Sequence, residues 1–193
     1  MPLNSSDKTF TLIPADAYRA MPWKNGRGIT HEIAAEEEQE LGWRLSIATI
    51  DCDGPFSDFT GYDRTIMTID GGDVELHFHD DDTFVKLDQY RPFQFAGERK
   101  VSCRLLSGTV RDFNVMTKRV SYDHEVNVRS TESTLVANEG ELCFVFVLRG
   151  KIVHPLIADV DDTLKIEGPA SVKLAFGDEA TMYALVRIIV QRG

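Results

Sequence analysis

Short runs that alternate between hydrophobic and polar residues recur along most of the chain. Runs rich in Val, Ile, Leu, Phe and Thr are WRLSIATI at 43–50, RTIMTID at 64–70, DVELHFH at 73–79, KVSCRLL at 100–106, ESTLVAN at 132–138, LCFVFVL at 142–148, DTLKIEG at 162–168, SVKLAFG at 171–177 and MYALVRIIV at 182–190. A period of two is typical of β-strands. Pieces such as DCDGP, DGGD and EGP lie between the runs and favour tight turns. The pattern predicts an all-β protein of antiparallel strands, arranged as a sandwich or barrel.

Helical periodicity is limited to two short segments. PADAYRAM at 14–21 and VMTKRV at 115–120 could each form a helix, and Pro22 would end the first. We therefore expect a small helix content.

The two halves of the chain show a weak internal similarity. TIMTIDGGDVELHF at 65–78 and VFVLRGKIVHPLI at 145–157 each place a hydrophobic strand, a glycine turn and another strand in succession. This similarity indicates a duplication, with a seam in the polar segment 119–132. We predict an N-terminal half at 1–125 and a C-terminal half at 126–193, packed as one unit because no flexible linker separates them.

Composition and charge narrow the function classes. The chain has 193 residues, 42% of them hydrophobic, and a formal charge of -10, which disfavours nucleic acid as a partner because phosphate binding needs clustered Lys and Arg. No apolar stretch of about 18 residues and no export segment is apparent, so we expect no membrane association. The three cysteines form no CxxC pair, which favours a cytoplasmic location.

Four stretches carry a family resemblance. They are PWKNGRGITHEI at 22–33, WRLSIATIDCDGPFSDFTGYDR at 43–64, PFQFAG at 92–97 and CRLLSGTVRDFNVMTKR at 103–119. The chain resembles the HutD/Ves family in these motifs, which cover roughly its first two thirds. The resemblance implies a bicupin, two antiparallel jelly-roll β-barrels packed as one unit. It also implies a cytoplasmic bacterial protein associated with histidine utilisation, which binds a small ligand or regulates rather than catalyses.

The PWKNGRG segment is a candidate ligand loop. Its glycines allow close approach to a ligand, Lys24 offers a point charge, Asn25 a donor and an acceptor, and Trp23 a flat apolar wall. This combination suits a small planar carboxylic acid. A structural turn at the end of a barrel is the alternative.

Two arginines are the candidates for binding a carboxylate. Arg64 ends GPFSDFTGYDR and Arg111 begins RDFN, and a guanidinium fork matches a carboxylate. Asp63 and Asp112 adjoin them and could instead form ordinary ion pairs. Adjacent strand residues face opposite sides, so one member of each Arg–Asp pair must point away from a barrel interior.

Two further residues are assigned to the ligand site, each with a structural alternative. Asn114 could line the pocket or cap a core element, and Trp43 could stack on a ligand or pack in the core.

The HFH motif, His77 and His79, resembles a metal-binding pair but stands after the glycine turn, whereas metal-binding cupins place it before that turn. His31, His124 and His154 lie in unrelated contexts, and a metal site needs converging ligands. We predict no metal and no cofactor.

The residues together favour a binding protein for a small anionic metabolite, such as urocanate or a formylated or formiminated glutamate, that reports pathway flux. One alternative is a metal-independent hydrolase or isomerase on a related metabolite, using Asp63, Glu32 or His31 as acid or base. Another is a non-catalytic cupin whose vestigial pocket is filled by Phe side chains. A homodimer is compatible with all three.

Overall fold

The computed structural model describes residues 10–23, 28–37 and 40–191 of the chain. These residues are nearly all in strands and the turns that join them, together with a short 3₁₀ helix at Ala15–Ala17. The chain divides into two compact units. One unit comprises residues 10–17 and Glu125–Val190, and the other comprises Tyr18–His124 and Gln191.

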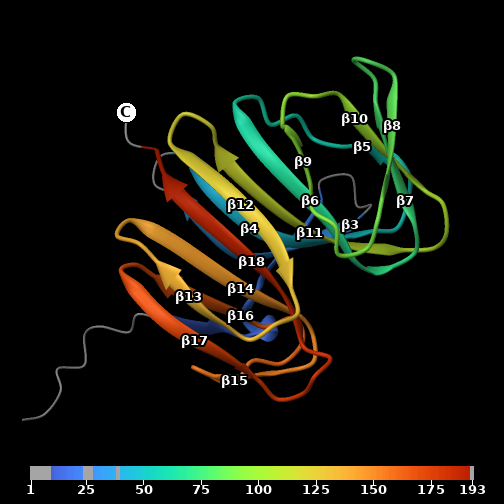
Figure 1. The fold of residues 1–193 in the computed structure, drawn as a ribbon. Helices are drawn as coiled ribbons and strands as arrows, with labels where there is room; N and C mark the ends of the chain where they lie inside the picture. The colour runs from blue at the N-terminus through green and yellow to red at the C-terminus, as the bar shows by residue number, and fades with distance from the viewer. Residues whose placement is uncertain (1–9, 24–27, 38–39, 192–193) are drawn as a thin grey trace, which may run out of the picture. The chain divides into compact units, whose positions relative to one another are not determined.

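The larger unit contains a six-stranded and a four-stranded antiparallel sheet (Figure 1). The six-stranded sheet has the order β2 (Arg19–Pro22), β3 (Gly28–Glu37), β4 (Leu41–Ile50), β11 (Val110–Lys118), β6 (Tyr62–Gly71) and β9 (Phe93–Ala96). The four-stranded sheet has the order β5 (Gly54–Pro55), β10 (Val101–Leu105), β7 (Val74–Phe78) and β8 (Thr83–Leu87).

An apolar core forms in this unit where the two sheets supply inward side chains. It includes Ile50 and Ile66 from the six-stranded sheet and Leu76, Phe78 and Cys103 from the four-stranded sheet. The burial of β7 alternates strictly along VELHF, as expected for a strand with one face in a core. Burying this apolar area is the main favourable term for the unit.

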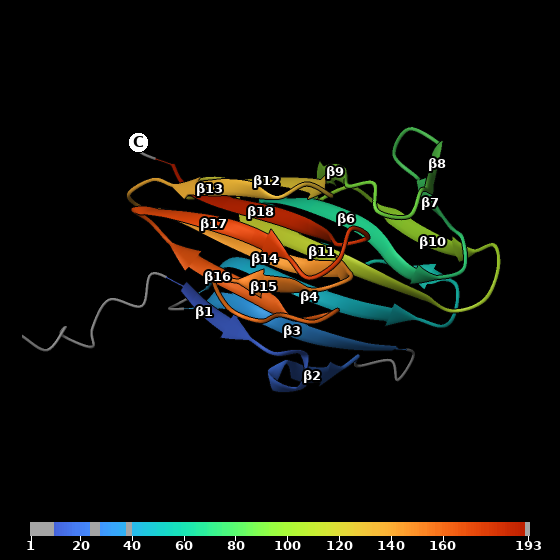
Figure 2. The same ribbon diagram turned by 60° about the horizontal axis from the view of Figure 1, so that its bottom comes forward.

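The smaller unit contains a five-stranded and a three-stranded sheet. The five-stranded sheet has the order β1 (Phe10–Ile13), β16 (Thr163–Glu167), β14 (Glu141–Arg149), β18 (Met182–Val190) and β12 (Tyr122–Arg129), and the unit boundary falls within β12. The three-stranded sheet has the order β13 (Ser133–Ala137), β17 (Ala170–Phe176) and β15 (Ile152–His154). Figure 2 shows β1 beside β16, so an N-terminal strand completes a sheet of C-terminal strands.

The core of the smaller unit is built from both of its sheets. Val145, Leu164 and Tyr183 from the five-stranded sheet and Leu135 and Leu174 from the three-stranded sheet are almost fully buried. β14 is the central strand of its sheet, and its sequence ELCFVFVLR is buried at nearly every position. A strand buried on both faces loses its alternation and becomes a continuous apolar run.

The prediction of an all-β protein is confirmed, and each of the nine hydrophobic runs named above forms a strand. No sheet of the described residues closes into a barrel. The helix predicted at 115–120 is wrong, because Val115–Lys118 continues β11 between β4 and β6. The helix at 14–21 is reduced to its Ala15–Ala17 turn, since Arg19–Pro22 pairs with β3.

The DGGD turn between β6 and β7 shows why glycine is required at a close approach. A Cβ on Gly72 would lie 1.2 Å from the carbonyl oxygen of Ser107, and Gly71 adopts a φ of +92°. Both positions would be strained by any other residue. The turn thereby fixes the exit of β6, the strand that carries Arg64.

Candidate functional site

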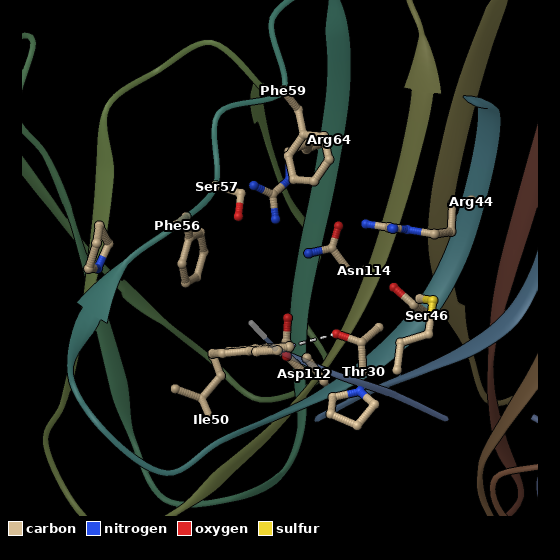
Figure 3. A pocket seen from close by; sticks show the side chains of 15 residues that line it. Thr30, Arg44, Ser46, Ile50, Phe56, Ser57, Phe59, Arg64, Asp112 and Asn114 are labelled. Carbon is tan, nitrogen blue, oxygen red and sulfur yellow. Dashed lines mark hydrogen bonds between the residues drawn. The ribbon is translucent and has the colours of Figure 1, made fainter. Parts of the chain in front are cut away.

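A pocket with a cavity volume of about 480 Å³ opens on one face of the six-stranded sheet in the larger unit (Figure 3). Its floor is made by side chains from β3, β4, β6 and β11, and its walls come from β2 and from the segment that follows β4. The lining residues are Met21, Pro22, Trp23, Thr30, Arg44, Ser46, Ala48, Ile50, Pro55, Phe56, Ser57, Phe59, Arg64, Asp112 and Asn114.

Strand alternation explains which side chains reach the pocket. On β4 the even-numbered residues from Arg44 to Ile50 line it, whereas Trp43, Leu45 and Ile47 are buried on the other face. On β11 the lining residues Asp112 and Asn114 are likewise two positions apart. One face of a continuous sheet therefore presents a compact polar floor.

Arg64 is a buried cation in this floor. Its residue is only 6% exposed, and its guanidinium carbon lies 5.3, 5.2 and 5.1 Å from the ring centroids of Phe56, Phe59 and Phe95. Burial lowers the pKa of Arg64 to about 10, partly offset by the nearby Asp112 carboxyl. The guanidinium stays protonated at neutral pH, and the aromatic rings hold it in place.

Arg44 supplies a second guanidinium from the opposite side of β11. Met116 is cross-strand from both Arg44 and Arg64, so the two arginines occupy one row, with their backbones about 10 Å apart. Arg44 donates a hydrogen bond to Met116 Sδ at 3.4 Å, and its guanidinium carbon lies 5.6 Å from the Phe59 centroid. Burial lowers the pKa of Arg44, while the Glu32 and Glu37 carboxylates raise it.

Several polar atoms of the floor are buried without a hydrogen-bond partner among the described residues. They are Nε of Arg44, Nε of Arg64, Oδ1 of Asp112 and Oδ1 of Asn114. In Figure 3 the Asn114 amide lies between the two guanidinium groups, with Asp112 below it. Buried polar groups are normally satisfied, so this concentration of unfilled donors and acceptors indicates a place for a polar ligand.

Asp112 is the pocket residue whose pKa lies furthest from its ordinary value. Its side chain is 2% exposed, and burial raises the pKa to about 7, against opposing contributions from Arg64 and from a hydrogen bond with the Asn114 side chain. The carboxyl therefore changes charge near neutral pH, which makes it a group able to accept or release a proton in the pocket.

Three of the residues that the sequence assigned to the site line the pocket together, namely Trp23, Arg64 and Asn114. Lys24 and Asn25 lie outside the described residues. Trp43 is buried on the opposite face of β4, and Arg111 lies cross-strand from Thr49 and Asp70, away from the lining residues.

Arg44 and Asp112 also line the pocket but were not predicted to do so, and the same holds for Ser46, Phe56, Ser57 and Phe59. Alternation was the signal that could have found the first two. If Asn114 faces the pocket, then Asp112 does as well, and Arg111 does not. The alternative acid–base candidates Asp63, Glu32 and His31 are not among the lining residues.

The HFH motif lies on β7 and the residue that follows it, in the four-stranded sheet. His77 Nε2 contacts Asp82 at 2.8 Å and His79 Nε2 contacts Ser102 Oγ at 2.9 Å; His77 is partly exposed and His79 is exposed. Within the described part of the chain, no group of three or more His, Cys, Asp or Glu side chains is arranged to hold a metal ion. No helix in that part is long and apolar enough to cross a membrane.

The sequence of the chain matches a known protein family. The HutD family model matches residues 15–184, which is most of the chain. The chain belongs to the HutD family. An uncharacterised 21.2 kDa protein of the hutC 3′ region of Pseudomonas putida is 44% identical over 81% of this chain and 86% of its own length, and protein Ves of Escherichia fergusonii is 36% identical over 66% and 69%.

Solved structures support the same grouping. HutD from Pseudomonas fluorescens SBW25, determined in a formate condition, is 29% identical and superposes with a TM-score of 0.85 over 95% of this chain and 100% of its own. A cupin 2 conserved barrel domain protein from Leptotrichia buccalis is 10% identical, with a TM-score of 0.58 over 89% and 92%. The second match shows a cupin-like fold alone, and the HutD/Ves relationship predicted from the four motifs is confirmed.

Proposed function

We propose that this protein binds a small carboxylate metabolite in the pocket of its larger unit, and that the bound state regulates histidine utilisation in the cytoplasm. In this proposal the two units are the two halves of a bicupin, and the N-terminal half carries the site. The observation that carries it is Arg64, a cation 6% exposed whose Nε has no hydrogen-bond partner among the described residues and which lines a cavity of about 480 Å³.

The charge distribution of the floor supports an anionic ligand. Arg44 and Arg64 are two cations facing the cavity, and Asp112 is partly neutral at pH 7 because its pKa is about 7. A carboxylate held by a buried guanidinium exchanges its hydration for charge-assisted hydrogen bonds, which are stronger than those between neutral groups. Phe56, Phe59 and Trp23 supply apolar walls that exclude water from the ion pair.

The cavity also bears on the alternative of a vestigial pocket. Phe56 and Phe59 line the walls of the cavity and do not fill it. A structural role alone gives no reason to bury the Nε atoms of Arg44 and Arg64 without a partner, because each such donor costs free energy in the absence of a ligand.

A thermal-shift screen tests the proposal. The purified protein is heated with urocanate, formiminoglutamate, formylglutamate, histidine, formate and other simple carboxylates, with and without a chelator. A ligand that binds only the folded state stabilises it by about 2.7 kcal/mol at a hundredfold excess over its Kd. We expect a chelator-insensitive shift with at least one acid, lost in Arg64→Ala. A flat screen would contradict the proposal.

A second candidate function is a metal-independent hydrolase or isomerase on a related metabolite, and Asp112 is the observation that favours it. A buried carboxyl with a pKa of about 7 is suited to general acid–base catalysis at neutral pH. Incubation of each binding acid with the protein, followed by NMR, distinguishes the two functions. Turnover that disappears in Asp112→Asn while binding persists would make the protein an enzyme.

A further inference from the structure

The pocket contains two buried hydrogen-bond acceptors, on Asp112 and Asn114, that a simple anion site does not need. Asp112 and Asn114 are 2% and 8% exposed, stand two residues apart on β11, and face the cavity. Oδ1 of each has no hydrogen-bond partner among the described residues. The Asn114 amide lies beside the Asp112 carboxyl and lowers its pKa, against the larger effect of burial.

The floor therefore has two chemically distinct parts. The Nε atoms of Arg44 and Arg64 are unfilled donors, whereas the Oδ1 atoms of Asp112 and Asn114 are unfilled acceptors. A ligand that carries only a carboxylate satisfies the donors and leaves the acceptors buried and unfilled, which weakens its binding. Such a ligand would also place its negative charge near the Asp112 carboxyl.

We infer that Asp112 and Asn114 are specificity-determining residues that accept an N–H group of the ligand, so that the site selects small acids bearing both a carboxylate and an N–H donor. The class includes azoles, amides and amidines that carry a carboxylate a few bonds away. The inference rests on the proposed function, because it assigns the carboxylate to the two arginines.

Recognition of an N–H group by Asp112 should change the number of protons that the protein binds. The charged or titratable groups that interact with this carboxyl are Arg64 on β6 and Cys103 on β10, with Asn114 beside it on β11. Arg44 on β4 interacts with Arg64, and Glu32 on β3 interacts with Arg44. An N–H donor stabilises the ionised carboxylate and lowers its pKa. A carboxyl with a pKa of about 7 is about half protonated at pH 7, so ligand binding releases up to about half a proton per site.

A neutral Asp112 that donates a hydrogen bond should exchange protons in the other direction. If neutral Asp112 instead donated its proton to the carboxylate of the ligand, binding would stabilise the protonated form. The protein would then take up a proton at pH 7. The direction of proton exchange thus separates recognition of an N–H group from recognition of a second anion.

Matched probes and calorimetry test the inference. Urocanate is compared with 3-(2-furyl)acrylate, which has the same acrylate but no ring N–H, and N-formylglutamate is compared with glutarate. Titrations at pH 7 in two buffers of different ionisation heat give the Kd and the number of protons exchanged. We expect at least one N–H acid to bind tenfold or more tightly than its matched probe, with proton release.

The variant Asp112→Asn keeps the shape of the side chain and removes its charge. We expect it to bring the two members of the pair to within about threefold of each other and to abolish the proton release. Asp73→Asn is the matched control: Asp73 is an exposed residue of the same unit, bonded to Lys86 at 2.9 Å, and it should keep the wild-type preference. Thermal unfolding checks that both variants are folded.

Several results would overturn the inference. Equal affinities within both pairs, or proton uptake, overturn the inference and leave the proposed carboxylate binding intact. Retention of the preference in folded Asp112→Asn also overturns it. Binding of none of the four acids overturns the inference, and a flat result over the whole screen of acids overturns the proposed function as well.

Discussion

The indole N–H of Trp23 donates a hydrogen bond to the Thr30 hydroxyl at 2.8 Å, which joins the end of β2 to β3 at the wall of the pocket. The backbone N–H of Trp23 also donates to the Gly28 carbonyl at 3.0 Å. A Cβ on Gly28 would lie 2.8 Å from the ring, so glycine lets the indole pack against the backbone. Trp23 is thereby held as a wall by its backbone, its ring face and its N–H.

Replacing Thr30 with Val should loosen this wall. The change keeps the side-chain shape and removes the acceptor of the indole N–H, a hydrogen bond worth about 1 kcal/mol. We expect a loss of ligand affinity of up to about tenfold and greater acrylamide quenching of Trp23. The chain has 2 tryptophans, so Trp43→Phe makes Trp23 the sole reporter. Thr134→Val, on an exposed position of the smaller unit, should change neither property.

The two arginines predicted from the sequence should behave differently. Arg64→Ala removes a buried cation from the cavity and should cost about 2–5 kcal/mol of carboxylate binding, because the anion is left in a dry site without its partner. Arg111→Ala should leave the affinity unchanged, since Arg111 lies outside the lining residues. Calorimetric titration of both variants measures the contrast.

Arg64→Lys refines the comparison. It retains a positive charge but lacks the planar fork and the Nε–H, so its affinity should fall between those of wild type and Arg64→Ala. Because Arg64 packs over three phenylalanine rings, each variant is first checked by thermal unfolding. An equal loss in Arg111→Ala would return Arg111 to the site and contradict the pocket assignment.

Most of the fold was accessible from the sequence because its central strands have a strong signature. The LCFVFVL run became β14 and the RTIMTID run became β6, both buried along nearly their whole length. Among the strands that were not identified, β8 is largely exposed, and β3 and β12 mix charged with apolar residues. β11 is buried at nearly every position, but Arg111, Asp112 and Asn114 interrupt its apolar pattern. Their positions depend on pairing with distant strands, which periodicity alone does not encode.

The site was only partly accessible for a related reason. Arg64 and Asn114 were found from their chemistry, whereas Arg44 was passed over beside the more conspicuous Trp43, which is buried on the other face of β4. Asp112 entered the sequence reasoning only through the alternative that it pairs with Arg111. Only the register, with Asp112 cross-strand from Ala48, shows that it faces the same cavity as Arg64.

His124 should make the protein less stable in mild acid. Its Nδ1 lies 2.6 Å from Thr117 Oγ1 and its Nε2 lies 2.8 Å from Thr65 Oγ1, and burial lowers its pKa below the ordinary value of 6.5. The unfolded chain then binds a proton more readily than the folded one. This contribution to stability is present above about pH 6.5 and is lost as the pH falls through the lower folded value.

Urea unfolding between pH 5 and 8 checks this prediction. Acidification should cost His124→Gln less unfolding free energy than it costs wild type, because Gln does not titrate, and the difference between the two proteins isolates His124 from Asp112. His154→Gln replaces an exposed histidine and should keep the wild-type profile. An unchanged slope in His124→Gln would show that another group controls the acid response.

Asp112 should act in the opposite direction. Its folded pKa of about 7 lies above the ordinary 3.8, so the stability linked to its protonated form is fully present below pH 3.8 and is lost as the pH rises through 7. Relative to wild type, ligand-free Asp112→Asn should therefore become progressively more stable from pH 5 to 7, by up to about 1.4 kcal/mol per pH unit, and the difference should level off above. Wild type alone cannot show this, because His124 offsets the trend in the same pH range. The difference in unfolding free energy between the two proteins isolates Asp112, and a constant difference from pH 5 to 7 would mean that the carboxyl is already ionised in the empty pocket.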